Sequence, residues 1–352
     1  MKTIKDYPLL SFLVISYNQE KYIEAAINSA LEQDYPNLEI IISDDNSTDN
    51  TYQIEKKISE NYHGKHKLIL NRNEQNIGIG ANFYKAFTLS SGEWLFMAAG
   101  DDISYPNRAS EIYKIIKRNE NCFGIDTARE VIDADGKSQG FLYWNEAMLG
   151  ASSAWHRRVF TDFHPIGKDI MSEDLLLQFR ALLLGNIVKT NKVLLMYRID
   201  GNSVSKPLVQ NMHEKKIIEL KKMKYYFFIL KGRINDLNLL NQTSKIDIYN
   251  SILDCLKYKM YFTELKIKEY TISLQPFSSN LSEIINYLFK KEIQPHDRFI
   301  YRLNLFLLRF NIFYFASKMS KSDSKKFDTI KTVIFETVQN IEEYIKLPIE
   351  IL

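Results

Sequence analysis

The chain has 352 residues, of which 45% are hydrophobic and 25% are charged. These are the proportions of a globular protein, and they exclude a chain that is mainly disordered, collagen-like or of low complexity. No run approaches the roughly 18 apolar residues that a membrane-spanning helix needs. The length is enough for two domains, or for one large domain with an extension.

Charge is unevenly distributed along the chain, although the net charge is only +3. Residues 1–200 contain 22 basic and 27 acidic residues, whereas residues 201–352 contain 24 basic and 16 acidic residues. A basic second half suits a phosphate-rich partner such as an anionic lipid, a lipid-linked substrate or a nucleic acid, but plain solvation of a Lys-rich helical region explains it equally well. No motif beyond charge points to nucleic acid, so we expect none as a partner.

The sequence carries two signals of its compartment. The first residues run directly into a strand-like segment, without an apolar stretch and a small-residue cleavage site, so export is not expected. Cys122 and Cys255 are far apart and form neither a disulfide framework nor a metal or redox motif. We therefore expect a cytoplasmic protein.

Strand-like and helix-like patterns alternate along the first 120 residues. The strand-like segments are 9–16, 38–43, 67–71 and 93–98, and the helical segments are 20–33, 47–61, 81–89 and 106–118. Residues 38–43 (LEIIIS) are a nearly continuous β-branched run, which is typical of a strand covered on both faces. The alternation predicts an α/β fold, with a mostly parallel sheet and helices on both faces.

The pattern changes after Cys122. Extended segments are expected at 125–143 (with a turn at 133–136), at 150–157 and at 187–198, and a helix at 173–184. Beyond residue 205 the sequence reads as helical nearly throughout. We predict a domain over residues 1–205, with halves at about 9–120 and 121–205, followed by a mainly helical region over 206–352.

Polar residues gather where predicted strands end or a helix begins. The groups are Ser16-Tyr17-Asn18 with Glu20, Asp44-Asp45, Gly100-Asp101-Asp102, and Ser172-Glu173-Asp174. Ligands of open α/β sheets bind outside the carboxyl ends of the strands, so we expect these groups to converge. Each group alone is also explained as a turn, a helix cap or a complement to a helix dipole.

The residue types suggest a different chemical role for each of these groups. Asp44 and Asp45 can accept hydrogen bonds from a nucleobase or a ribose hydroxyl, and Tyr17 can offer an aromatic face. Asp101 and Asp102 suit Mg²⁺ or Mn²⁺, which bind through one or two carboxylates plus substrate phosphates and stabilise a leaving diphosphate. Asp174 is a candidate general base for an incoming hydroxyl.

The run from Ser11 to Thr51 (SFLVISYNQEKYIEAAINSALEQDYPNLEIIISDDNSTDNT) resembles the opening of nucleotide-sugar glycosyltransferases of the GT-A fold, glycosyltransferase family 2. The shared features are the Ser-Tyr-Asn turn after a strand, a helix that leads to Gln33-x-Tyr35-Pro36-Asn37, and a strand followed by DD-x-S-x-D-x-T. The later groups Asn76-Ile77-Gly78, Gly100-Asp101-Asp102 and Glu173-Asp174 keep the order of the family. The resemblance covers about residues 9–205.

The resemblance implies a role for each matching residue. The nucleotide-binding set would be Ser16, Tyr17, Asn18, Glu20, Asp44, Asp45, Asn76, Gly78 and Asp101, with Asp45 on the base, usually uracil. Asp102 would bind the metal, Mn²⁺ or Mg²⁺, and Asp174 would be the catalytic base of an inverting transfer. The acceptor side would be formed by Glu173, His156 and Arg157. Gln178 and Arg180, and the later Tyr197-Arg198 and Ser203-x-Ser205, also match family motifs.

The expected function is an inverting transfer from a nucleotide sugar, a UDP-sugar first, to a glycan or polyprenyl-linked acceptor in bacterial surface polysaccharide synthesis. Ala99 departs from the frequent D-x-D-D pattern, which leaves open a decayed nucleotide-sugar-binding or scaffold protein of the same fold. A dinucleotide-dependent oxidoreductase is rejected, because no G-x-G-x-x-G follows the first strand. The aromatic segment 299–321 either lies on the inner membrane face or packs against the catalytic domain or a second copy in a homodimer.

Overall fold

The computed structural model describes residues 7–143, 150–167, 169–170, 173–199 and 212–244, together with eight single residues between 253 and 267. It divides into two compact units, Met1–Pro207 and Leu208–Leu352. The segment 299–321 and the motif Ser203-x-Ser205 lie outside the described residues, as do Ser172 and Cys255.

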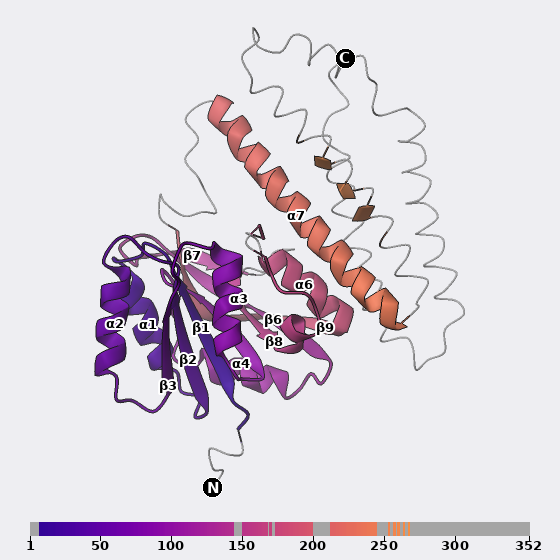
Figure 1. Ribbon diagram of the computed structural model, residues 1–352. Coiled ribbons are helices and arrows are strands. Elements are labelled where there is room, and N and C mark those ends of the chain that lie inside the picture. The colour runs from indigo at the N-terminus through magenta and orange to yellow at the C-terminus, as the bar shows by residue number, and fades with distance from the viewer. Residues whose placement is uncertain are drawn as a thin grey trace, which may run out of the picture. The chain divides into compact units, whose positions relative to one another are not determined.

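The first unit is built on one nine-stranded sheet (Figure 1). Its strands are β1 (Leu10–Ser16), β2 (Leu38–Asp44), β3 (Lys67–Arg72), β4 (Trp94–Ala99), β5 (Ile103–Ser104), β6 (Cys122–Ile132), β7 (Ser138–Leu142), β8 (Ser153–His156) and β9 (Asn186–Arg198). Its helices are α1 (Ile23–Leu31), α2 (Thr51–Asn61), α3 (Ile79–Leu89), α4 (Arg108–Ile116), α5 (Arg158–Thr161) and α6 (Glu173–Leu184), with a 3₁₀ turn η2 (Gly150–Ser152).

The strand order is β3-β2-β1-β4-β8-β6-β9-β5, and β7 pairs with β6 outside this path. Strands β3, β2, β1 and β4 are mutually parallel, as the alternation of patterns predicts. Strand β8 runs antiparallel to both of its neighbours, and β6 and β9 are parallel to each other. The α/β prediction is confirmed, and the sheet is mixed because β8, β7 and β5 run antiparallel to the other strands.

Helices cover both faces of the parallel part, as expected. On one face, alternate residues of β1 (Leu10, Phe12 and Val14) join a core with residues of α1 and α4. On the other face, α3 packs on β1 and β2, and its Phe87 stacks on Phe160 of α5. Every residue of β2 is buried, which fits its β-branched sequence. Figure 1 shows α1 and α2 on one side of β1–β3 and α3 on the other.

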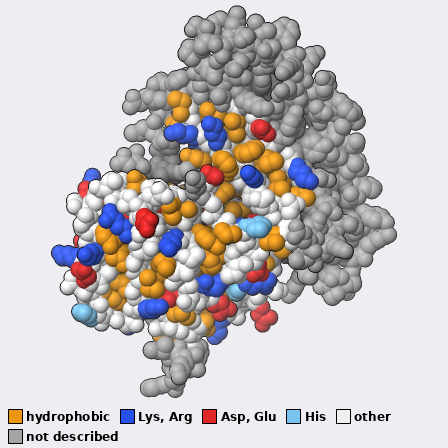
Figure 2. Space-filling model, in the orientation of Figure 1, with side chains coloured by type: hydrophobic (Ala, Val, Ile, Leu, Met, Phe, Trp, Pro, Cys, Tyr) orange, Lys and Arg blue, Asp and Glu red, His pale blue; other side chains and the backbone are white. Residues whose placement is uncertain are grey.

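The surface of this unit mixes charges. Figure 2 shows Lys and Arg, Asp and Glu, and hydrophobic side chains interspersed over the face turned to the viewer.

The second unit contains α7 (Met212–Ser244), whose Ile229, Leu230 and Leu237 are buried. Among the residues that the structure describes, no helix is both long and apolar enough to span a bilayer.

Candidate active site

The parallel strands bring three of the predicted polar groups to one edge. Ser16 and Asp44 are register partners at the ends of β1 and β2. The amide of Gly100, which follows β4, donates to the carbonyl of Ile15 at 2.9 Å. The amide of Asp45 donates in turn to the carbonyl of Ser16 at 2.9 Å. The expected convergence of these groups therefore follows from the register of three neighbouring strands.

Two loops at this edge are interlocked. The amide of Asn18 donates to Ser47 Oγ at 2.9 Å, and Asn18 Oδ1 accepts from the amide of Thr48 at 2.8 Å. Glu20 Oε2 accepts from the amide and the side chain of Asn50, at 3.0 and 2.8 Å. Asn18 and Asn46 have φ values of 53° and 61°, a left-handed conformation that asparagine tolerates better than most residues. Asn18 and Glu20 thus shape the edge, while Tyr17 is 44% exposed and free to meet a ligand.

Asp45 fixes a third loop. Its Oδ1 accepts hydrogen bonds from Asn73 Nδ2 and the amide of Ile77, both at 2.9 Å, and its Oδ2 accepts from the amide of Gly78 at 2.8 Å. Gly78 has a φ of 87°, which glycine adopts without strain. A carboxylate has about four acceptor positions, so Asp45 retains capacity for one further donor such as a base imide. Asn76 stands exposed within the loop that Asp45 holds.

Amide side chains support the same loop from behind. Asn82 of α3 donates to the carbonyl of Ser43 at 2.8 Å, and its Oδ1 accepts from Asn73 at 2.9 Å. Asn71 Nδ2 donates to Ser43 Oγ at 3.0 Å and to Asn73 Oδ1 at 3.1 Å. Because Asn73 and Asn82 are buried, these hydrogen bonds hold the loop rigidly in place.

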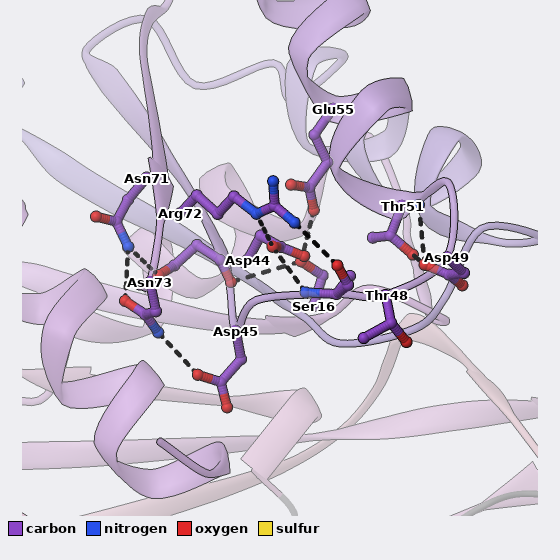
Figure 3. Close-up of polar contacts among 12 residues, drawn as sticks. Ser16, Asp44, Asp45, Thr48, Asp49, Thr51, Glu55, Asn71, Arg72 and Asn73 are labelled. Carbon is purple, nitrogen blue, oxygen red and sulfur yellow. Dashed lines mark hydrogen bonds and ion pairs between the residues drawn. The ribbon is translucent and has the colours of Figure 1, made fainter. Parts of the chain in front are cut away.

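Asp44 faces away from Asp45 into a buried charged cluster (Figure 3). Its Oδ2 accepts from the amide of Ser47 at 3.0 Å and lies 3.4 Å from Arg72 Nε. Arg72 also donates to the carbonyl of Ser47 at 3.0 Å, and its guanidinium lies 4.4 Å from the ring centre of Tyr52. Glu55 of α2 joins from the other side by accepting from Ser16 Oγ at 2.5 Å. Asp44 therefore holds loop 45–48 in shape.

The carboxylate group after β4 is also buried. Asp102 Oδ1 accepts from the amide of Arg198 at 2.8 Å, whereas its buried Oδ2 has no hydrogen-bond donor among the residues that the structure describes. Burial raises the pKa of Asp102 well above its usual range, and the charge of Asp101 adds to the rise. The Arg198 guanidinium donates to the carbonyls of Asp101, Asp133 and Ala134, which pins this turn to the β6–β7 turn.

This donor set fits a Mg²⁺ or Mn²⁺ ion that is shared with a substrate. The unpartnered Oδ2 of Asp102 offers one oxygen ligand, and substrate phosphates supply others where a site has only one or two carboxylates. The described residues contain no cluster of three or more His, Cys, Asp or Glu side chains that could hold an ion without a substrate. A cation at this place would therefore depend on Asp102, with the neighbouring Asp101, and on the phosphates of a substrate.

Glu173 and Asp174 open α6 beside η2. Glu173 is buried, and its Oε1 lies 3.1 Å from the position that a Cβ on Gly150 would occupy. Burial, followed by the charge of Asp174, raises the pKa of Glu173 to about 8. Burial raises the pKa of Asp174 to about 6, hydrogen bonds from the amides of Leu175 and Gly150 counteract this, and the charge of Asp126 adds to the rise. Burial thus makes Asp174 a stronger base than an ordinary aspartate.

Buried arginines connect Asp102 to the region of Asp174. Arg108 of α4 donates to the carbonyl of Met97 on β4 and to that of Ala151 in η2, both at 2.8 Å. Its charge lowers the pKa of Asp102. Arg129 of β6 donates to Ser152 Oγ at 2.7 Å, and Ser152 Oγ donates to Asp126 Oδ1 at 2.6 Å. Both arginines therefore contact η2, the turn whose Gly150 amide is hydrogen-bonded to Asp174.

Two predicted acceptor residues lie elsewhere. His156 is the register partner of Trp94, the first residue of β4, whereas Asp101 and Asp102 follow the last. A strand of that length spans roughly 16 Å at 3.3 Å per residue. Arg157 donates to the carbonyl of Gly92 at 2.7 Å and to Ser90 Oγ at 2.8 Å, and so fixes the turn before β4. The structure does not bring His156 and Arg157 together with the carboxylates.

The remaining matching residues have packing roles. Arg180 donates to the carbonyl of His164 at 2.7 Å and lies over Phe163, and Gln178 is buried on the same helix. Sequence reasoning missed Glu55, Arg72, Arg108, Asp126 and Arg129. All five lie within helices or strands, where nothing in the local pattern marks a charged residue as part of a site.

This geometry is typical of a nucleotide-dependent α/β transferase, and comparison gives the family. Residues 11–170 match the model of glycosyl transferase family 2. An uncharacterized glycosyltransferase of Haemophilus influenzae is 26% identical over 344 residues, which cover 86% of this chain and 99% of the relative. Chondroitin synthase of Escherichia coli is 30% identical over 164 residues, covering 45% of this chain and 23% of that protein. Over residues 11–170 the chain is therefore similar to glycosyltransferase family 2.

A solved structure supports the fold. Residues 1–349 of Staphylococcus aureus TarS, in complex with UDP-GlcNAc, superimpose with a TM-score of 0.50 at 18% identity, covering 94% of this chain and 92% of that chain. At this identity, the likeness concerns the GT-A fold alone.

Proposed function

We propose that the protein transfers a sugar from a nucleotide-sugar donor, a UDP-sugar first, to a hydroxyl group of a glycan or lipid-linked acceptor, with inversion at the anomeric carbon. The observation that carries this proposal is the pairing of two carboxylates with different environments. Asp102 is buried with one oxygen that has no hydrogen-bond donor among the described residues, and Asp174 lies partly buried at the start of α6, where burial raises its pKa. Inverting transfer needs one group on each side of the reacting carbon.

The nucleotide occupies the edge formed by β1, β2 and β3 in this proposal. Tyr17 offers its exposed ring to the base, and Asp45 uses its remaining acceptor position. The loop that Asp45 holds, with Asn76 and Gly78, borders the nucleotide. Asp101 lies next to Asp102 and faces the ribose or the sugar. Ser16, Asn18, Glu20 and Asp44 keep this edge in shape from beneath.

The transfer step needs a base on the acceptor side. Asp174 takes the proton of the acceptor hydroxyl. The oxygen of that hydroxyl attacks the anomeric carbon, and the bond from this carbon to the diphosphate breaks. Glu173, which is largely protonated at neutral pH, donates a hydrogen bond to the acceptor. A divalent cation held by Asp102 would stabilise the negative charge of the leaving diphosphate.

We further propose a cytoplasmic protein in bacterial capsule, lipopolysaccharide or other surface glycan synthesis. Support comes from chondroitin synthase, a named polysaccharide-forming relative over 45% of this chain. In this account, the residues beyond 205 contact a polyprenyl-linked acceptor at the inner membrane face or a second copy of the chain.

The test is a transfer assay in which radiolabelled nucleotide sugars are incubated with a pool of lipid-linked acceptors. The amount of sugar transferred is compared between the wild type and Asp174→Asn. Transfer by the wild type alone, with unchanged nucleotide affinity in the variant, supports the proposal. Equal transfer by both would remove Asp174 as the base. If neither transfers while both bind nucleotide, the decayed binding or scaffold protein takes the place of the enzyme.

A further inference from the structure

A fully buried carboxyl group lies on the inner face of α2. Within this helix the buried residues are Thr51 and Glu55, one helical turn apart. Glu55 is 0% exposed and stands where an amphipathic helix normally has an apolar residue. Glutamate is almost never fully buried unless it is paired, so this position calls for a physical explanation.

The partner of Glu55 is the last residue of β1. Ser16 Oγ donates to Glu55 Oε1 at 2.5 Å, and the carbonyl of Ser16 accepts the amide of Asp45. Glu55 therefore holds the residue that begins the loop after β1 and whose carbonyl is bonded to the first residue of the loop after β2 (Figure 3). Two buried oxygens in this cluster have no hydrogen-bond donor among the described residues, namely Glu55 Oε2 and Asp44 Oδ1.

The charges around Glu55 disfavour its ionised form. Asp44 at the end of β2 and Asp49 before α2 are negative, and Arg72 at the end of β3 is the cation that faces it. Arg72 is committed to Asp44 and to the carbonyl of Ser47, and its side chain is 37% exposed. The only charged residue of α1, which also packs on α2, is the exposed Glu24. Burial, as the largest cause, raises the pKa of Glu55 to about 8, and the hydrogen bond from Ser16 opposes this rise without cancelling it.

We propose that Glu55 is a positioning residue for the nucleotide subsite: it accepts the Ser16 hydroxyl, and while it is protonated the end of β1 packs beside Asp44, whereas its ionisation sets a second buried negative charge against Asp44 and displaces this end of the strand. A proton on Glu55 removes a second buried negative charge next to Asp44 and turns an unsatisfied acceptor into a donor. This inference rests on the proposed function, because it assigns a pH-dependent support to the nucleotide subsite.

The experiment is calorimetric titration at pH 7 and pH 9 with the diphosphate, among UDP, dTDP and GDP, that binds the wild type. The variants are Glu55→Gln, which mimics the protonated form, Glu55→Ala, and the control Glu60→Gln on the exposed face of α2. If binding needs the protonated form, affinity falls about tenfold between pH 7 and pH 9 in the wild type and in the control. Ionisation of the nucleotide itself changes the affinity of Glu60→Gln and of Glu55→Gln alike, so the difference between these two variants reports on Glu55.

Glu55→Gln should bind the nucleotide as the wild type does at pH 7. Its affinity at pH 9 should not show the part of the fall that ionisation of Glu55 causes in the wild type. Glu55→Ala should bind weakly at both values, because the Ser16 hydroxyl then keeps only its long hydrogen bond of 3.5 Å to the carbonyl of Ser43. If Glu55→Gln shows the same fall as the wild type, the proposal is wrong.

A second readout does not need a nucleotide. The midpoint of thermal unfolding should drop from pH 7 to pH 9 in the wild type and in Glu60→Gln, and less in Glu55→Gln. Failure of every nucleotide to bind, with this difference in melting retained, would count against the proposed function and for the protonation of Glu55. Identical pH dependence of melting in all variants would overturn the protonation.

Discussion

The carboxylate of Asp102 accepts a hydrogen bond of 2.8 Å from the amide of Arg198, and so ties the end of β4 to the end of β9. The bond uses Oδ1 and leaves Oδ2 without a partner. Oδ1 therefore stabilises the fold, while Oδ2 remains available to bind a cation. This division makes the role of Asp102 separable by mutation.

Asp102→Asn tests that division. The amide oxygen can still accept from Arg198, so we expect a folded protein with a nearly unchanged melting temperature. Transfer should fall by about 10² or more, because the charge that anchors a cation at the diphosphate is lost. Turnover and thermal melting are measured on the same preparation. Undiminished turnover in the presence of Mn²⁺ would show that Asp102 anchors no cation.

Asp174 gives a prediction for pH dependence. Its folded pKa of about 6 means that the base is ionised above pH 6 and protonated below it. The transfer rate should therefore fall as the pH decreases through about 6. A profile of turnover from pH 5 to pH 8 measures this, and an acid limb near pH 4 would contradict the assigned environment.

Asp174→Asn removes the base while preserving the hydrogen bond from the amide of Leu175. General base catalysis contributes about 10²–10⁴ in rate, so turnover should fall by that factor. Nucleotide affinity should be unchanged, because Asp174 faces the acceptor in this account. A matched control is Asp162→Asn, whose partner Arg158 lies in α5 on the surface.

Asp45→Asn should loosen the loop 73–78. The amide nitrogen of asparagine cannot accept a hydrogen bond, so at least one of the three donors that Asp45 now satisfies is left unpaired. A lost partner of this kind costs about 1–3 kcal/mol. We expect that loss in urea unfolding, together with weaker nucleotide binding. Unchanged unfolding would mean that the loop is held by the asparagine network alone.

Ser152→Ala tests the buried charges between β6 and η2. The Ser152 hydroxyl accepts from Arg129 and donates to Asp126, and these two side chains are fully buried. Without it, both are left partly unsatisfied, and the free energy of unfolding should drop by about 1–3 kcal/mol. Ser110→Ala, which removes an exposed hydroxyl bonded to Asp34, should cost much less. Equal costs would contradict a structural role for Ser152.

The strand-end groups could be predicted because position in an α/β sheet carries information. A polar residue directly after a buried strand must lie at the carboxyl edge, so Ser16, Asp45 and Asp102 were placed correctly by the alternation of patterns alone. The shape-holding parts of Asn18 and Glu20 could not be foreseen, because they depend on a neighbouring loop that approaches only in the folded sheet.

The positions of His156 and Arg157 show how strand direction decides where a residue lies. The resemblance to the family implied that they belong to the acceptor side of the site. Because β8 runs antiparallel to β4, the end of β8 lies at the start of β4 instead. Strand direction depends on pairing, which local patterns do not reveal. Glu55 and Asp126 were missed for a related reason, since a buried acid inside an element looks like any surface acid in sequence.

The most direct test of the central claim is calorimetric titration of the full chain with UDP, dTDP and GDP, each with and without Mn²⁺. The account predicts that one nucleotide, UDP first, binds tightly with Mn²⁺ and much more weakly without it, and that Asp102→Asn removes this difference. Absence of binding by all three nucleotides to a folded sample would contradict the account.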